Sequence, residues 1–303
     1  MARVAVVHGV GQQYEGERSL QLTIAPALCD GIDHAGGVVP ADDDIHVAFY
    51  GNLFREEDAR GDEEPGEPRS GDNSVEAGLA LAWWRAAAHV DPENVQSPDD
   101  VTDTRGKTSL TVKAALRALS MSRFATRATQ RALLGELRQV RHYLYGDGRE
   151  AVLEKVCAQI APDTEVVVGH SLGSVVAYEA LCALPGHRVR ALITLGSPLG
   201  IRNLVFDQLR PAPSMGRGVW PGVGVQWTNI CDRHDVVALV EQLSGLFGDG
   251  DPAVTDVRPS PGLAEGTEVI RDQTVDNGWR AHDLLRYLRA SATGRAVHAG
   301  LTS

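Results

Sequence analysis

The sequence predicts an α/β protein with a mostly parallel β-sheet that is covered by helices on both faces. Two observations lead to this fold class. From residue 149 onward, short β-branched runs alternate with helix-like segments, as in doubly wound sheets. The first run, residues 3–7 (RVAVV), is continuously apolar, which is typical of a strand buried on both faces.

The expected elements follow this alternation along the chain. Residues 18–35 carry helical spacing at Leu20, Ile24 and Leu28, and the run from Ile45 to Tyr50 predicts the second strand. The remaining strands are expected at 165–169, 189–195, 225–231 and, weakly, 267–271, and the remaining helices at 149–160, 172–184, 236–247 and 282–291.

Residues 52–148 interrupt the pattern and predict an inserted helical cap. The core then comprises residues 1–51 and 149–303. Acidic stretches rich in Gly and Pro at 55–73 and 91–106 indicate loops, 75–90 predicts an apolar helix, and 108–145 predicts one or two basic amphipathic helices. The acidic stretches and the basic helices of this insertion could neutralise each other within one subdomain. Alternatively, the basic helices could face an anionic substrate or lipid headgroups.

Composition excludes several classes of function. The formal net charge of -11 and the pI near 5.4 argue against a nucleic-acid partner. No apolar run approaches the ~18 residues of a membrane span, and the apolar N-terminal stretch is too short for a signal peptide. The four cysteines, at 29, 157, 182 and 231, are far apart, which indicates reduced packing thiols and a cytoplasmic protein. No metal-ligand, phosphate-loop or dinucleotide pattern occurs, so we expect no metal and no cofactor.

The segment Gly169-His170-Ser171-Leu172-Gly173 is the strongest functional signal. It matches G-x-S-x-G, directly follows the apolar run EVVV and directly precedes a helix pattern. In that strand–turn–helix context a serine lies on a tight, strained turn with its hydroxyl clear of the sheet, and the helix N-terminus favours developing negative charge. The pattern indicates that Ser171 is a catalytic nucleophile.

On these residues the sequence resembles the α/β-hydrolase superfamily, in particular its lipase and esterase branch. The resemblance covers most of the chain outside the insertion. It implies a three-layer α/β-hydrolase fold and catalytic residues in the order Ser…Asp…His. Larger members carry two antiparallel strands before the strand that corresponds to 3–7, so a reduced sheet of about six strands is expected here.

The resemblance places the acid and the base after later strands. Asp235, followed by two valines, resembles the family's acid better than Asp232, which we expect to be a turn or hydrogen-bonding residue. His282 follows the last expected strand and is the expected base, whereas His298 lies in a tail segment. The acid would orient the imidazole, and the imidazole would take the serine proton. Ser197 is a weak alternative nucleophile.

The resemblance also implies an oxyanion hole built from backbone N–H groups. Leu172 supplies one donor, and the loop His8-Gly9-Val10-Gly11 supplies the other, from Val10 or else Gly9. Other residues are candidates to line the substrate site, although His170 is expected to point into packing and the tryptophans could instead pack the cap onto the core. These candidates are His8, His170, Trp83 and Trp84.

Together these features predict hydrolysis of a carboxylic ester with a hydrophobic or lipid-like acyl group through an acyl-serine intermediate. The same triad could serve a peptidase or amidase, a thioesterase or an acyltransferase, because one hydrolase fold hosts many reactions. A binding protein that keeps a hydrolase scaffold without catalysis is the remaining alternative.

Overall fold

The computed structural model describes residues 2–55, 73–100, 111–122, 130–248 and 268–303. Within them, one six-stranded sheet has the order β2-β1-β3-β4-β5-β6, and every neighbouring pair is parallel. This confirms the predicted α/β class and the parallel sheet. The strands are β1 (Val4–Val7), β2 (Ile45–Ala48), β3 (Val166–His170), β4 (Ala191–Leu195), β5 (Gln226–Asp232) and β6 (Ile270–Val275).

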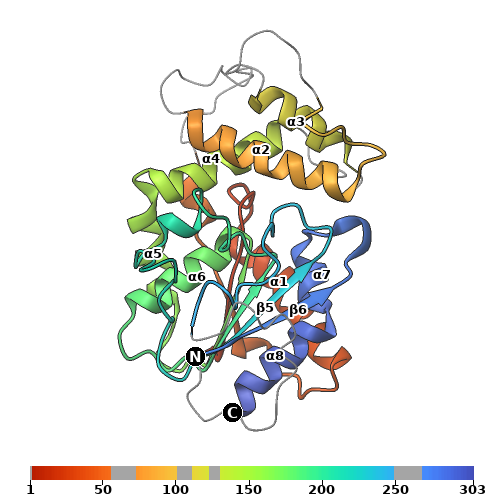
Figure 1. Cartoon of the computed structure of the whole chain (residues 1–303). Coiled ribbons are helices and arrows are strands. Elements are labelled where there is room, and N and C mark those ends of the chain that lie inside the picture. Colours follow the sequence, from red (N-terminus) through yellow and green to blue (C-terminus); the bar gives the residue numbers. More distant parts are fainter. Residues whose placement is uncertain (1, 56–72, 101–110, 123–129, 249–267) are drawn as a thin grey trace.

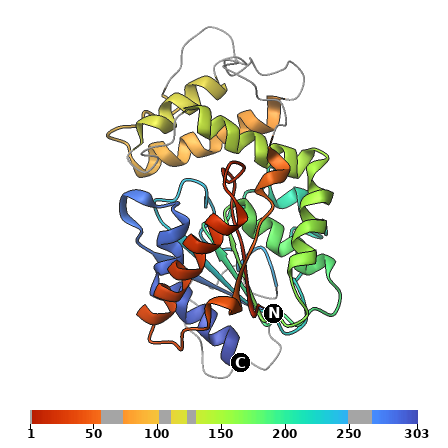
Figure 2. The same cartoon turned by 180° about the vertical axis from the view of Figure 1, so that it is seen from behind.

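Helices cover both faces of this sheet, which gives three layers (Figure 1; Figure 2). One face packs against α1 (Glu17–His34), α7 (Leu284–Arg289) and α8 (Ser291–Thr302), and the other against α5 (Gly148–Gln159) and α6 (Leu172–Ala183). Alternate residues of each strand point to opposite faces of the sheet, so they join the hydrophobic cores on its two sides. In β1, for example, Val4 and Val6 join the α1 side, and Ala5 and Val7 join the α6 side. The buried β-branched runs of the sequence arise from this double coverage.

Three further helices lie above the carboxyl ends of the strands: α2 (Asn73–Val90), α3 (Thr111–Met121) and α4 (Gln130–Tyr145) (Figure 1). Within the described residues of the stretch 108–145, for which the sequence predicts one or two helices, there are two, α3 and α4. Trp83 and Trp84 of α2 are buried in a hydrophobic cluster that continues into the α6 side of the sheet, and the Trp84 indole N–H donates to the carbonyl of Gln96 at 2.8 Å. Both side chains are thus buried within hydrophobic packing.

The segment 236–247 is irregular, so the helix predicted there is wrong. The carboxylates of Asp272, distant in sequence, and of Asp235, just before the segment, accept several of its backbone N–H groups. Asp272 on β6 accepts from Leu243 and Ser244 at 2.9 and 3.0 Å, and Asp235 accepts from Val237 at 2.9 Å. Apolar spacing cannot reveal such long-range partners.

The C-terminal elements also differ from their expected limits. The last strand begins at Ile270, three residues later than predicted. The helix expected at 282–291 is α7, which is shorter at both ends, and α8 follows it in the tail segment that contains His298. Asp283 caps α7 by accepting from the Arg286 N–H at 3.1 Å. In the part of the chain that is described, no helix is long and apolar enough to cross a bilayer, and all four cysteines are free thiols.

Candidate active site

Ser171 lies on a strained turn between β3 and α6. Its φ of 52° and ψ of −129° belong to a region that residues with a side chain rarely adopt. Its flanking glycines permit the close packing of this turn. A Cβ atom added at Gly169 would lie 2.6 Å from the Cα of Ser174, and one added at Gly173 would lie 2.2 Å from the carbonyl oxygen of His8. The G-x-S-x-G spacing is thus required sterically by the fold.

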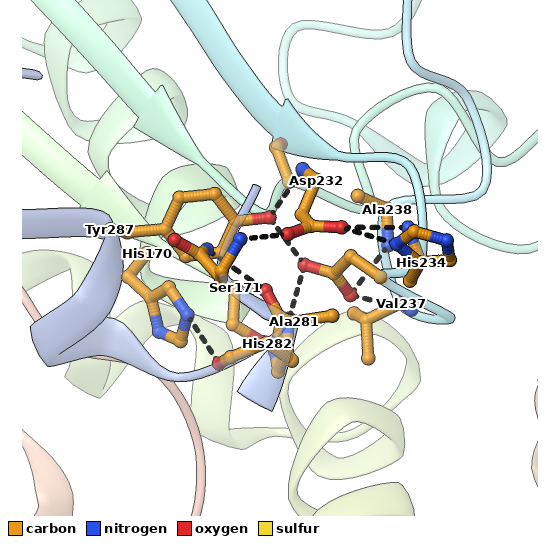
Figure 3. Close-up of polar contacts among 12 residues, drawn as sticks. His170, Ser171, Asp232, His234, Val237, Ala238, Ala281, His282 and Tyr287 are labelled. Atoms are coloured by element: carbon orange, nitrogen blue, oxygen red, sulfur yellow. Dashed lines mark hydrogen bonds and ion pairs between the residues drawn. The ribbon is translucent and has the colours of Figure 1, made fainter. Parts of the chain in front are cut away.

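Two loops at the same edge of the sheet bring Asp235 and His282 together. Asp235 lies three residues beyond β5, and His282 lies between β6 and α7. The Nδ1–H of His282 donates to Oδ2 of Asp235 at 2.8 Å, and the hydroxyl of Tyr287 donates to the same oxygen at 2.7 Å (Figure 3). Since Asp235 is fully enclosed, these bonds hold a buried carboxylate in one orientation.

The electrostatics of this pair favour two charged partners. Burial alone would raise the pKa of Asp235, but the nearby His282 charge and the hydrogen bonds from His282 and Tyr287 lower that pKa below its usual value. Burial would lower the pKa of His282, yet Asp235 outweighs burial and raises it. The imidazole is therefore a stronger base than a free histidine.

Asp232, the second candidate acid, has a different task. One carboxylate oxygen accepts from the His234 N–H at 2.8 Å, and the other accepts from the Asn277 N–H, so Asp232 ties the turn after β5 to the turn after β6 (Figure 3). None of its contacts is to His282. The sequence expectation that Asp235 pairs with the histidine and Asp232 supports a turn agrees with this geometry.

Tyr287 is a site residue that the sequence did not reveal. It lies on α7, donates to Asp235, and accepts from the Asp232 N–H at 2.8 Å, so it links both carboxylate residues. Its position in LLRYLR suggests only a core tyrosine.

His170 supports the position of His282 rather than presenting itself to a substrate. Its ring is buried, and the centroids of the His170 and His282 rings are 4.7 Å apart. The Nε2–H of His170 donates to the backbone carbonyl of His282 at 3.1 Å. Burial lowers the pKa of His170 to about 3, so the ring stays neutral. The expectation that His170 points into packing agrees with this arrangement, and its candidate role in substrate binding does not.

His8 is likewise built into the protein, which argues against its candidate role as a substrate contact. The Tyr50 N–H donates to Nε2 at 3.1 Å, so the proton is on Nδ1, which donates to the Gly9 carbonyl at 2.7 Å. Burial lowers the pKa of His8 to about 4. In a trans peptide the Val10 N–H points opposite to the Gly9 carbonyl, so the His8 ring sets the direction of that N–H.

The loop after β1 and the start of α6 both lie against Ser171. A Cβ atom added at Gly9 would be 2.9 Å from the Ser171 Cβ. Within the ranges that the structure describes, neither the Val10 nor the Leu172 N–H has a hydrogen-bond acceptor. Both are therefore available to an oxyanion, while the Gly11 N–H is already bonded to Gln139 at 3.1 Å.

Ser171 and His282 occupy the same edge without a hydrogen bond between them. Among the described residues the Ser171 hydroxyl and Nε2 of His282 have no partner. Ser197, by contrast, donates its hydroxyl proton to Ser174 at 2.7 Å, because the Ser174 proton is bonded to the Ser171 carbonyl at 2.6 Å, and it accepts from the Leu199 N–H. His298, on α8, packs beside Gly37. Hydrogen bonds between catalytic groups are commonly long before substrate binds. The Ser171 hydroxyl and Nε2 of His282 therefore remain the candidate reactive pair.

Comparisons with protein-family models and with curated proteins find no match to this chain. The described residues also contain no cluster of His, Cys, Asp or Glu suited to a metal ion. What the arrangement offers chemically is a strained serine, a histidine paired with a buried carboxylate, and unpaired N–H groups beside the serine.

Proposed function

We propose that the chain is a serine hydrolase of the α/β-hydrolase type that cleaves a carboxylic ester through an acyl-serine intermediate. The observation that carries the proposal is the 2.8 Å His282–Asp235 bond at the sheet edge where Ser171 occupies its strained turn. A carboxylate-paired imidazole next to a serine on such a turn is the arrangement that activates a hydroxyl.

In the proposed reaction the Ser171 oxygen attacks the ester carbonyl and transfers its proton to Nε2 of His282. The imidazolium is stabilised by Asp235. The Val10 and Leu172 N–H groups donate to the oxyanion of the tetrahedral intermediate. His282 then protonates the departing alcohol, and a water molecule that gives its proton to His282 releases the acid and regenerates the Ser171 hydroxyl. This chemistry uses side chains and backbone only.

The direct test is reaction of the folded protein with a fluorophosphonate probe, followed by mass spectrometry of the labelled peptide. We expect a single adduct on Ser171, no adduct in Ser171→Ala, and an unchanged adduct in Ser197→Ala, which removes the alternative serine. Absence of labelling in protein with a normal melting transition would favour a non-catalytic scaffold.

A panel of p-nitrophenyl esters, acyl thioesters and peptide amides identifies the bond that is cleaved. The proposal expects esters to react fastest. A higher kcat/KM for amides or thioesters would keep the nucleophile and replace the ester assignment by a peptidase or thioesterase.

A further inference from the structure

One face of α4 rests on the loop that follows β1. Gln139 accepts from the Gly11 N–H at 3.1 Å and donates to Oε1 of Gln13 at 2.9 Å. Glu136 lies almost one turn earlier on the same face, and its Oε1 is 3.5 Å from the position that a Cβ atom on Gly11 would occupy. The carboxyl group of Glu136 thus enters the site from the cap, beside the loop that carries Val10.

The Glu136 carboxylate is half-buried and has neither a hydrogen bond nor an ion pair to any residue in the described part of the chain. Other enclosed carboxylates are partnered. Glu179 accepts from the Tyr143 hydroxyl at 2.6 Å and pairs with Arg149 at 3.6 Å, and Glu76 pairs with Arg141 at 3.8 Å. A partly enclosed carboxylate without a protein partner is free to pair with a cationic group that enters the site.

The surroundings of Glu136 favour a positive charge. Burial raises the pKa of its carboxyl group, and the His282 charge lowers it, so Glu136 lies within electrostatic reach of the imidazole. His282 already pairs with Asp235 at 2.8 Å, so it does not neutralise Glu136 as well. During the proposed reaction a second negative charge would develop near the Val10 N–H. An unpaired carboxylate there would oppose it unless the substrate supplies a cation.

We propose that Glu136 selects substrates that carry an ammonium group next to the scissile carbonyl, as in esters of amino acids. This inference rests on the proposed function. The ammonium group would donate a hydrogen bond to the Glu136 carboxylate while the carbonyl oxygen lies between the Val10 and Leu172 N–H groups. Glu136 would then determine specificity, and the chemical steps would remain with Ser171 and His282.

The test uses two esters of nearly equal shape, alanine ethyl ester and ethyl isobutyrate, in which a methyl group replaces the ammonium group. Measured at neutral pH by chromatography of the released acid, kcat/KM for the alanine ester should exceed that for isobutyrate by roughly 10- to 100-fold, the range for one charge-assisted hydrogen bond. Glu136→Gln should abolish this preference by slowing hydrolysis of the alanine ester, and it should not slow isobutyrate hydrolysis, because it removes the negative charge that opposes the oxyanion. Glu154→Gln, which removes an exposed carboxylate of α5, should keep the preference.

Three results would overturn the inference. The wild-type protein could show no preference for the alanine ester. Glu136→Gln could lower both rates equally, which would mean that Glu136 acts on His282 and not on the substrate. The wild-type protein could also hydrolyse neither ester and fail to label with fluorophosphonate, which would remove the proposed function too. If the fluorophosphonate probe labels Ser171 and the protein hydrolyses isobutyrate, but the alanine ester is not preferred, only the role of Glu136 is removed.

Discussion

Replacing Asp235 by asparagine should reverse the proton arrangement of His282. Oδ1 of Asp235 accepts from the N–H groups of Val237 and Ala238 at 2.9 and 3.4 Å, so the single oxygen of an asparagine belongs there. Its NH2 group then replaces Oδ2 and donates to Nδ1 of His282. The imidazole proton is forced onto Nε2, where it blocks acceptance of the Ser171 proton.

The loss of activity in Asp235→Asn should be large, because the substitution removes the reactive tautomer of His282 while the rest of the site stays assembled. We expect kcat/KM to fall on the order of 10⁴-fold, or about 5.5 kcal/mol of transition-state stabilisation. The assay is hydrolysis of p-nitrophenyl butyrate, with enzyme concentration taken from the folded fraction in a thermal melt, because an adduct titration would itself be slowed by the substitution.

Asp232→Asn is the matched control. Asp232 is equally buried but accepts from the N–H groups of His234 and Asn277 and does not contact His282. Its substitution should cost about 1–3 kcal/mol of stability and reduce kcat/KM of the folded protein far less. A larger catalytic loss in Asp232→Asn than in Asp235→Asn would refute the assignment of the acid.

Three further predictions test the base, the strained turn and the helix packing. Because Asp235 raises the pKa of His282 above 6.5 and only the neutral imidazole accepts a proton, kcat/KM should fall as the pH drops through a midpoint above 6.5; a midpoint below 6 contradicts this. Ser171→Gly should abolish activity yet raise the melting temperature, since relief of an unfavourable φ is worth about 1–3 kcal/mol; an unchanged or lower melting temperature contradicts the strain. Gly173→Ala should destabilise by about 1–3 kcal/mol, because its Cβ would clash with the backbone oxygens of Val7 and His8. Gly135→Ala on α4 has open space around it and should stabilise by about 0.5–1 kcal/mol; equal effects on thermal melts refute the packing argument.

Local patterns in the sequence were sufficient for the strands and for much of the candidate site. The β-branched runs predicted the parallel strands because burial on both faces leaves β1, β3 and β4 almost entirely apolar, with His170 and Thr194 as the buried polar exceptions. The apolar pair Val236-Val237 after Asp235 separated that residue from Asp232. The Val237 N–H donates to the Asp235 carboxylate, so this short segment also helps to hold it.

Features that depend on contacts between distant segments were not predictable in this way. The segment 236–247 has helical spacing but is irregular, and Asp272 of β6 accepts the N–H groups of Leu243 and Ser244 within it. Tyr287 is separated from Asp235 by 52 positions, and Glu136 approaches Gly11 from the cap. No periodicity encodes such encounters, because they arise only when the cap and the loops after the strands assemble.

A crystal structure of the phosphonate adduct would test the catalytic assembly most directly. We predict phosphorus bonded to the Ser171 oxygen, the phosphoryl oxygen about 2.7–3.1 Å from the Val10 and Leu172 nitrogens, and Nε2 of His282 within hydrogen-bond reach of an adduct oxygen. An adduct on another residue, or a His282 ring separated from the adduct by more than one water molecule, would contradict the account.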